Sequence, residues 1–162
     1  MIYTIDITTP KNTSILNPLR SVLKVTYGFV YKVEFDFPPG PKGLLHVVVF
    51  DGGFQLWPHS RGLTFHANNY CISFDDSYFK SSPPYEFEVY TWNNDDTFDH
   101  AIQIRVGLVT EKMYIQRFLP HMAIDELKAY FEELEAKRQE EKAVALESPF
   151  PWITPEETGL GE

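Results

Sequence analysis

The chain is poor in cysteine, in basic side chains and in long apolar runs, and each shortage argues against a class of protein. Cys71 is the one cysteine among 162 residues, so an intrachain disulfide cannot form. The usual argument for a secreted domain held by disulfides is therefore removed. No run reaches the roughly 18 apolar residues of a membrane span, and residues 1–6 lack the basic start and apolar run of a signal peptide. We expect neither a transmembrane segment nor a signal peptide.

Basic charge is scarce. The chain has 14 lysines and arginines against 23 aspartates and glutamates, which gives a net charge of −9. Most of the excess negative charge follows residue 124, and the part before it is close to neutral. Phosphate backbones are bound by stripes of basic side chains, and no such stripe is present. We therefore expect no nucleic-acid partner.

Common catalytic and metal-binding motifs are also missing. There is no Gly-x-Ser-x-Gly elbow, no phosphate-binding glycine loop and no dinucleotide-binding fingerprint. The five histidines are not spaced as zinc ligands. Cys71 lies in the apolar run at 70–74, which predicts a buried, unreactive thiol. The sequence therefore predicts a protein that is not an enzyme and has no cofactor.

Aromatic residues are abundant, at 15% of the chain, and many alternate with polar residues. Alternation with a period of two is typical of a strand with one face on a core. Turn residues separate the alternating runs, which predicts an antiparallel β-sandwich of the jelly-roll kind. Residues 13–25 stay ambiguous, because Pro18 argues against a long regular element there. The expected strands are 2–8, 28–37, 44–50, 54–57, 63–66, 70–74, 84–92 and 100–110.

The run at 44–50 is apolar almost throughout, broken only by His46. An alternating pattern would leave one face polar, and this run does not. We therefore expect a central strand that is covered on both faces, by the sandwich interior on one side and by a neighbouring element on the other.

The pattern changes after residue 112. Residues 113–119 fit either a strand end or a short helical bridge, and from about Asp125 the spacing becomes helical. Apolar residues recur there at intervals of three and four up to Leu134, so we expect the helix to dock over about three turns and then to extend into solvent. The chain thus divides into a β-sandwich at 1–122, a charged amphipathic helix at 123–146 and an extended proline-rich arm at 147–162.

The arm and the helical stripe are the candidate partner-binding residues. Large apolar side chains alternate with prolines in the arm, and exposing them to water is unfavourable. Proline stiffens such a segment, so less entropy is lost when it docks. The arm either folds back on its own sandwich or reaches a neighbouring subunit. The expected partner-binding residues are Phe150, Trp152, Ile153, Leu127, Phe131 and Leu134.

The turn at 93–99 is rich in side-chain oxygens and is the one candidate metal site. Asp95, Asp96 and Asp99 offer carboxylates, and Ca²⁺ takes six to eight oxygen ligands. The spacing of a calcium-binding EF-hand is absent, however. Asn and Asp also build turns through local hydrogen bonds, and we favour this interpretation, so no metal is expected.

One strand face carries a candidate sugar site. Glu86, Glu88, Tyr90 and Trp92 point to the same side of the expected strand, about 7 Å apart per two-residue step. If that face is exposed, it combines carboxylate acceptors with aromatic platforms, as sugar-binding sites do. The alternative is an outer face that is solvated or covered by a partner.

Three segments resemble a group of small, uncharacterised β-sandwich proteins of tailed phages and related viruses. They are YKVEFDFPPGPKGLLHV at 31–47, PPYE at 83–86 and WNNDDTFDH at 92–100, and the resemblance covers residues 28–110. It implies a structural role in the virion, as capsid decoration or as a tail or baseplate component assembled in the host cytoplasm. It brings no catalytic residues.

Two functions follow from the sequence as hypotheses. The first is a non-enzymatic structural protein of a virion, which packs by its sandwich faces and its C-terminal arm against other virion proteins and against copies of itself, with a trimer as the guessed symmetry. The alternative is a carbohydrate-binding or adhesion module that uses the face with Glu86, Glu88, Tyr90 and Trp92. Neither requires a membrane.

Overall fold

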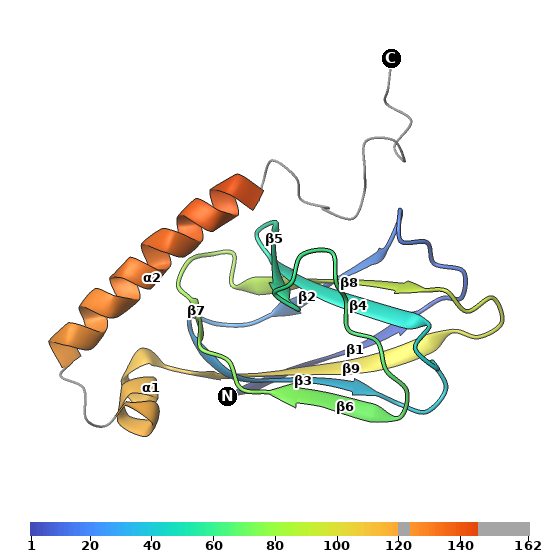
Figure 1. Ribbon diagram of the computed structural model, residues 1–162. Helices are drawn as coiled ribbons and strands as arrows, with labels where there is room; N and C mark the ends of the chain where they lie inside the picture. Colours follow the sequence, from blue (N-terminus) through green and yellow to red (C-terminus); the bar gives the residue numbers. More distant parts are fainter. Residues whose placement is uncertain (120–123, 146–162) are drawn as a thin grey trace, which may run out of the picture.

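The computed structural model describes residues 1–119 and 124–145, and this part of the chain forms a sandwich of two antiparallel sheets with two helices at one end (Figure 1). The prediction of a mainly β sandwich followed by a C-terminal helix is therefore confirmed. The proline-rich arm at 147–162 lies outside the described residues.

The first sheet, sheet A, has the strand order β1-β9-β3-β6, with β7 also paired to β3. The second, sheet B, has the order β2-β8-β4-β5. The strands of sheet A are β1 (Ile2–Thr9), β9 (His100–Val109), β3 (Gly28–Phe37), β6 (Tyr70–Phe74) and β7 (Tyr78–Lys80). Those of sheet B are β2 (Leu19–Lys24), β8 (Glu86–Asn93), β4 (Leu45–Asp51) and β5 (Phe54–Trp57).

The core lies between the two sheets and is built from the inward-facing positions of alternating strands. The inward positions of β3, β8 and β9 follow a period of two and are mostly apolar and buried, with Thr91 and Asn93 of β8 as buried polar exceptions. Burial of this apolar surface is the main favourable term in folding. The core includes Val33, Phe35, Phe37, Val47, Val49, Phe87, Val89, Ile102, Ile104 and Val106.

The outer face of sheet A is charged along the middle of β3 and β9, whereas Phe29 and Val109 at one end pack under the two helices. The Arg105 guanidinium donates to Glu34 at 2.9 Å and to Asp36 at 2.8 Å, and Gln103 donates to Asp6 at 2.7 Å. A network of this kind suits a face of an antiparallel sheet that meets water.

The outer face of sheet B is different, because it is apolar and buried. Val48, Phe50 and Trp92 form a separate cluster there and are only 0%, 2% and 4% exposed, with Tyr90 packed beside them. Strand β4 is consequently buried on both faces. This confirms the expectation for the run at 44–50.

Several elements differ from the sequence prediction. Residues 13–25, which the sequence left ambiguous, contain β2, which begins at Leu19 directly after Pro18. Strand β7 was not predicted, because a strand of three residues shows no period. Residues 63–66 form no strand, and only an isolated bridge joins Phe65 to Val47. Residues 113–119, which fitted either a strand end or a short helical bridge, lie in and just after a helix, α1 (Glu111–Phe118). This helix begins after the N-cap Thr110. Cys71 is half-buried rather than buried.

Helix α2 (Ile124–Ala145) packs against the sandwich of its own chain. Leu127 and Phe131 are buried in a cluster with Phe29, Val109 and Tyr114. The Phe29 ring lies 4.5 Å from the rings of both Tyr114 and Phe131, between centroids.

This packing corrects two expectations for the helix. Leu127 and Phe131 do not face a partner, because the sheet of the same chain buries them, and Leu134 packs beside them. The helix also keeps contacting the sandwich beyond Leu134. Arg138 lies over the Tyr78 ring at 4.2 Å from its centroid, and Lys142 donates to Asp51. The spacing of apolar side chains cannot predict these contacts, because the last turns of the helix dock through cations.

Asp51, the last residue of β4, accepts hydrogen bonds from three side chains, two on β7 and one on α2. Its carboxylate receives Lys80 Nζ at 2.6 Å, Lys142 Nζ at 3.0 Å and the Tyr78 hydroxyl. The side chains of Lys80 and Asp51 are only 2% and 3% exposed. A buried charge is strongly unfavourable unless a partner neutralises it, so β4, β7 and α2 are held in a fixed relation.

Phe131→Ala tests whether α2 docks on its own chain. We expect a loss of about 3–5 kcal/mol in the free energy of unfolding, because a buried aromatic ring is removed. The neighbouring Tyr130 is 53% exposed, so Tyr130→Ala is the matched control, with an expected change within about 0.5 kcal/mol. Urea denaturation measures both. Equal small effects would show that Phe131 contributes nothing to the fold.

Asp51→Ala tests the buried ion pair. The substitution leaves Lys80 buried without its carboxylate, and we expect a loss of about 3–5 kcal/mol in the free energy of unfolding. Glu133→Ala is the control, since Glu133 forms an exposed pair with Lys137 at 2.7 Å. That variant is expected to lose less than about 0.5 kcal/mol. If both variants unfold at the same urea concentration, Asp51 does not hold these elements together.

Candidate binding site

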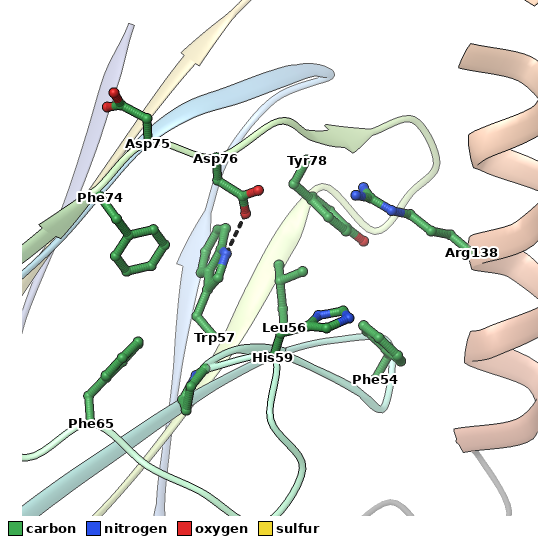
Figure 2. Close-up of a pocket in the computed structure, with 11 residues that line it drawn as sticks. Phe54, Leu56, Trp57, His59, Phe65, Phe74, Asp75, Asp76, Tyr78 and Arg138 are labelled. Carbon is green, nitrogen blue, oxygen red and sulfur yellow. Dashed lines mark hydrogen bonds between the residues drawn. The ribbon is translucent and has the colours of Figure 1, made fainter. Parts of the chain in front are cut away.

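A cavity of about 460 Å³ opens at one edge of the sandwich (Figure 2). It lies between β5 and the following segment on the side of sheet B and the segment joining β6 to β7 on the side of sheet A. Helix α2 closes part of it through Arg138. The volume falls within the range of about 300–1,000 Å³ that is usual for small-molecule sites.

The cavity walls are mainly apolar. Leu56, Trp57 and Tyr78 form a buried floor, and Phe65 and Phe74 are half-buried, so these two rings supply the accessible apolar surface. Their ring centroids are 5.9 Å apart. An apolar group that entered the cavity would therefore contact two phenylalanine rings.

The carboxylates of the rim are already engaged. Asp76 Oδ2 accepts the indole N–H of Trp57 at 2.7 Å, and Asp76 Oδ1 accepts the backbone N–H of Ser77 at 2.7 Å (Figure 2). Asp75 is exposed and pairs with Lys32 at 3.1 Å. These bonds fix the carboxylates and reduce what they can offer a ligand.

Arg138 is the cation of the cavity. Its guanidinium lies over the Tyr78 ring, and it forms no ion pair with any acidic residue in the described part of the chain. Burial, and then the charge of Asp51, raise the pKa of the Tyr78 phenol, so the ring beneath the guanidinium stays neutral. The five donors of Arg138 are therefore available to an anion.

Sequence reasoning missed this cavity. Its walls come from three stretches that are separated in the sequence, residues 54–65, residues 74–78 and Arg138 of helix α2. No local pattern marks such a site. The aromatic run of β5 that ends at Pro58 was the nearest signal, and it predicts only a strand.

The four candidate sugar-binding residues do share the outer face of β8, but they form no open platform. Trp92 is buried and stacks on His46, with ring centroids 5.3 Å apart. Glu88 accepts two donors of Arg20, and burial followed by the charge of Glu88 raises the pKa of Tyr90. Glu86 is half-buried. The sugar site required an exposed indole, and the structure does not provide it.

The aspartates of the turn at 93–99 are used as turn residues. Asp95 Oδ1 accepts the backbone N–H groups of Thr97 and Phe98, at 2.7 and 3.1 Å, and Oδ2 pairs with His100 Nε2 at 2.8 Å. Asp96 accepts the Thr97 hydroxyl and Asp99 accepts the backbone N–H of Lys11. The three carboxylates point to different local donors, as in a turn built by side chains.

Other sites were also sought. Within residues 1–119 and 124–145, no group of three or more His, Cys, Asp or Glu side chains lies close enough to hold a metal ion. Neither of the described helices is long and apolar enough to cross a membrane. The expected partner-binding residues Phe150, Trp152 and Ile153 lie outside the described residues.

A scan against models of protein families found none that fits this chain, and a search of curated proteins found no similar sequence. Function is therefore inferred from the residues themselves.

Asp95→Asn tests the turn through its pH dependence. The backbone N–H of Thr97, and then His100, lower the pKa of the Asp95 carboxyl. The charged form is thus favoured in the fold, and its stabilisation is complete above the ordinary value of about 3.9 and is lost as the pH falls through the folded pKa. We expect the variant to be less stable than the wild type at pH 7 and the difference to shrink towards pH 2.5. Unfolding free energies at both pH values measure it, and a constant difference would contradict this assignment.

Proposed function

We propose that this chain is a non-enzymatic structural protein that assembles with copies of itself through its C-terminal residues 147–162. The observation that supports this proposal is the buried apolar face on the outside of sheet B. That face carries Val48, Phe50 and Trp92, whereas the outer face of sheet A carries the charged network around Arg105.

The contrast between the two outer faces indicates a covering layer over sheet B. An antiparallel sheet with one solvated face places polar side chains on that face, as sheet A does. Large apolar side chains that are only a few per cent exposed are removed from water, which is worth about 1.5–3 kcal/mol for each large side chain. These exposures are those of one chain, so residues of the same chain already cover this face, and exchange of that cover between copies would attach one copy to the next.

Residues 147–162 have the composition of such a layer. Phe150, Trp152 and Ile153 are large and apolar, and the prolines between them stiffen the segment. Sixteen extended residues reach about 50 Å, about twice the length of β8. Lys142 fixes the last turns of α2 beside Asp51 at the end of β4, so the described chain ends next to sheet B.

In this proposal, residues 147–162 of a neighbouring copy pack over the face by exchange. Exchange of an identical element between protomers is a low-cost route to assembly, and a trimer is the working symmetry. The resemblance of residues 28–110 to phage and viral sandwich proteins suggests the setting, a virion, as capsid decoration or as a tail or baseplate component. The sugar-binding alternative has less support, because its aromatic platform, Trp92, is buried.

The test is the solution mass of the full-length chain over a dilution series, measured by light scattering. The wild type is expected to form a stable oligomer, and the double variant Phe150→Ser with Trp152→Ser is expected to be monomeric, because it loses the apolar anchors. The control is Glu156→Ser with Glu157→Ser, which changes the same segment without touching those anchors and should keep the wild-type mass.

Two results would overturn the proposal. An oligomer that persists in the Phe150 and Trp152 double variant would show that other surfaces hold the copies together. A wild type that is monomeric at every concentration, together with a lower unfolding temperature in the double variant, would show that the segment folds onto its own chain instead.

A further inference from the structure

The open edge of the sandwich leaves an apolar space between its layers that extends the core outwards. Strand β5 has four residues and β7 has three, so neither sheet closes this edge, and the half-buried rings of Phe65 and Phe74 remain at the opening. An apolar group of small size can therefore leave water there without displacing a core side chain.

The charged side chains around this space differ in how much hydrogen-bonding capacity they have left for a ligand. Asp76 is held by Trp57 and Ser77, and Asp75 is held by Lys32. Arg138 has only an aromatic ring beneath it and no acidic partner among the described residues. The planar guanidinium binds a carboxylate through two parallel hydrogen bonds, which makes a carboxylate the best complement for it.

We propose that this cavity binds a small organic carboxylate with an aromatic or branched apolar body, with the body against Phe65 and Phe74 and the carboxylate on Arg138. This inference rests on the cavity and is independent of assembly through residues 147–162. The volume of about 460 Å³ is near the lower end for small-molecule sites, which favours a compact ligand.

Two other ligand classes fit the same walls less well. An amine would have to compete for Asp75 and Asp76 with the donors that already hold them, and it would meet repulsion from Arg138. A neutral sugar would find few accessible acceptors, because Trp57 and Tyr78 are buried and show little ring surface. The amine is one of the probes of the test below.

The experiment is isothermal titration calorimetry of the full-length protein at pH 7 with three probes that share one apolar body. They are 3-phenylpropionate, its neutral amide 3-phenylpropionamide, and the cation 3-phenylpropylamine. The carboxylate is expected to bind more tightly than the amide by about tenfold or more, because it adds charge-assisted hydrogen bonds. The amine is expected to bind most weakly.

Arg138→Gln should abolish the preference of the wild type for the carboxylate over the amide. The matched control is Arg117→Gln, because Arg117 also lies over an aromatic ring, that of Tyr31 at 5.4 Å, but does not line the cavity. Phe74→Trp provides a second test that leaves the charges unchanged, since a larger ring narrows the cavity and should weaken the binding of the carboxylate and the amide alike. Thermal unfolding of each variant checks that α2 stays docked.

Three results would overturn the inference. The first is that none of the probes binds to the wild type. The second is that the amine binds most tightly, which would assign the site to cations held by Asp75 and Asp76. The third is that Arg138→Gln and Arg117→Gln change carboxylate binding equally, which would place the carboxylate elsewhere on the surface.

Discussion

The buried carboxylate of Asp51 is the interaction on which the rest of the molecule depends. It ends β4, accepts Lys80 and Tyr78 from β7, and accepts Lys142 from the far end of α2. A buried ion pair contributes little net stability compared with apolar side chains of the same volume. It does favour one arrangement, because Lys142 reaches Asp51 only when the helix is docked, whereas Lys80 pairs with Asp51 in any position of the helix. The apolar contacts of Phe131 attach the first half of α2, and Asp51 sets where its second half lies.

The outer faces of the two sheets differ in polarity, and this difference bears on function. On sheet A, Arg105 and the acidic residues around it form a surface that is stable in water, and the apolar end with Phe29 and Val109 lies under the helices. On sheet B, Val48, Phe50 and Trp92 make the corresponding surface a second core. They are at most 4% exposed in a single chain, so residues of the same chain already cover them. Assembly through this face would therefore require that cover to be exchanged between copies.

The regular strands were predictable from the sequence because their physics is local. The strand expected at 28–37 is β3, the one expected at 70–74 is β6, and the one at 100–110 is β9 with one residue fewer. In each of these strands, apolar side chains face the core and polar side chains face the surface, so the sequence alternates with a period of two. Strand β7 is too short to show a period, although its residues Tyr78 and Lys80 donate hydrogen bonds to the buried carboxylate of Asp51.

The parts that could not be predicted are those that depend on contacts between distant segments. The pattern of α2 predicted a docked stripe but not its target, since Leu127 and Phe131 would look the same against a partner or against Phe29. Arg138 and Lys142 looked like solvated positions, because a cation that reaches a distant tyrosine or aspartate has the same sequence signature as one in water. The cavity draws its walls from three separate stretches of the chain, so no single window of sequence contains it.

Helix α2 links the two proposals physically. Arg138 and Lys142 are four residues apart and therefore lie on the same face of the helix, one over Tyr78 and the other on Asp51. An anion that pairs with Arg138 would bind to the docked helix and not to a detached one, and so would stabilise the docked form. The same docked form fixes where the described part of α2 ends relative to sheet B. By reciprocity, a partner segment that binds only beside the docked helix would favour the anion site, and the free energy of coupling would be the same in both directions. Anion binding in the cavity and packing on sheet B would then both depend on the position of helix α2.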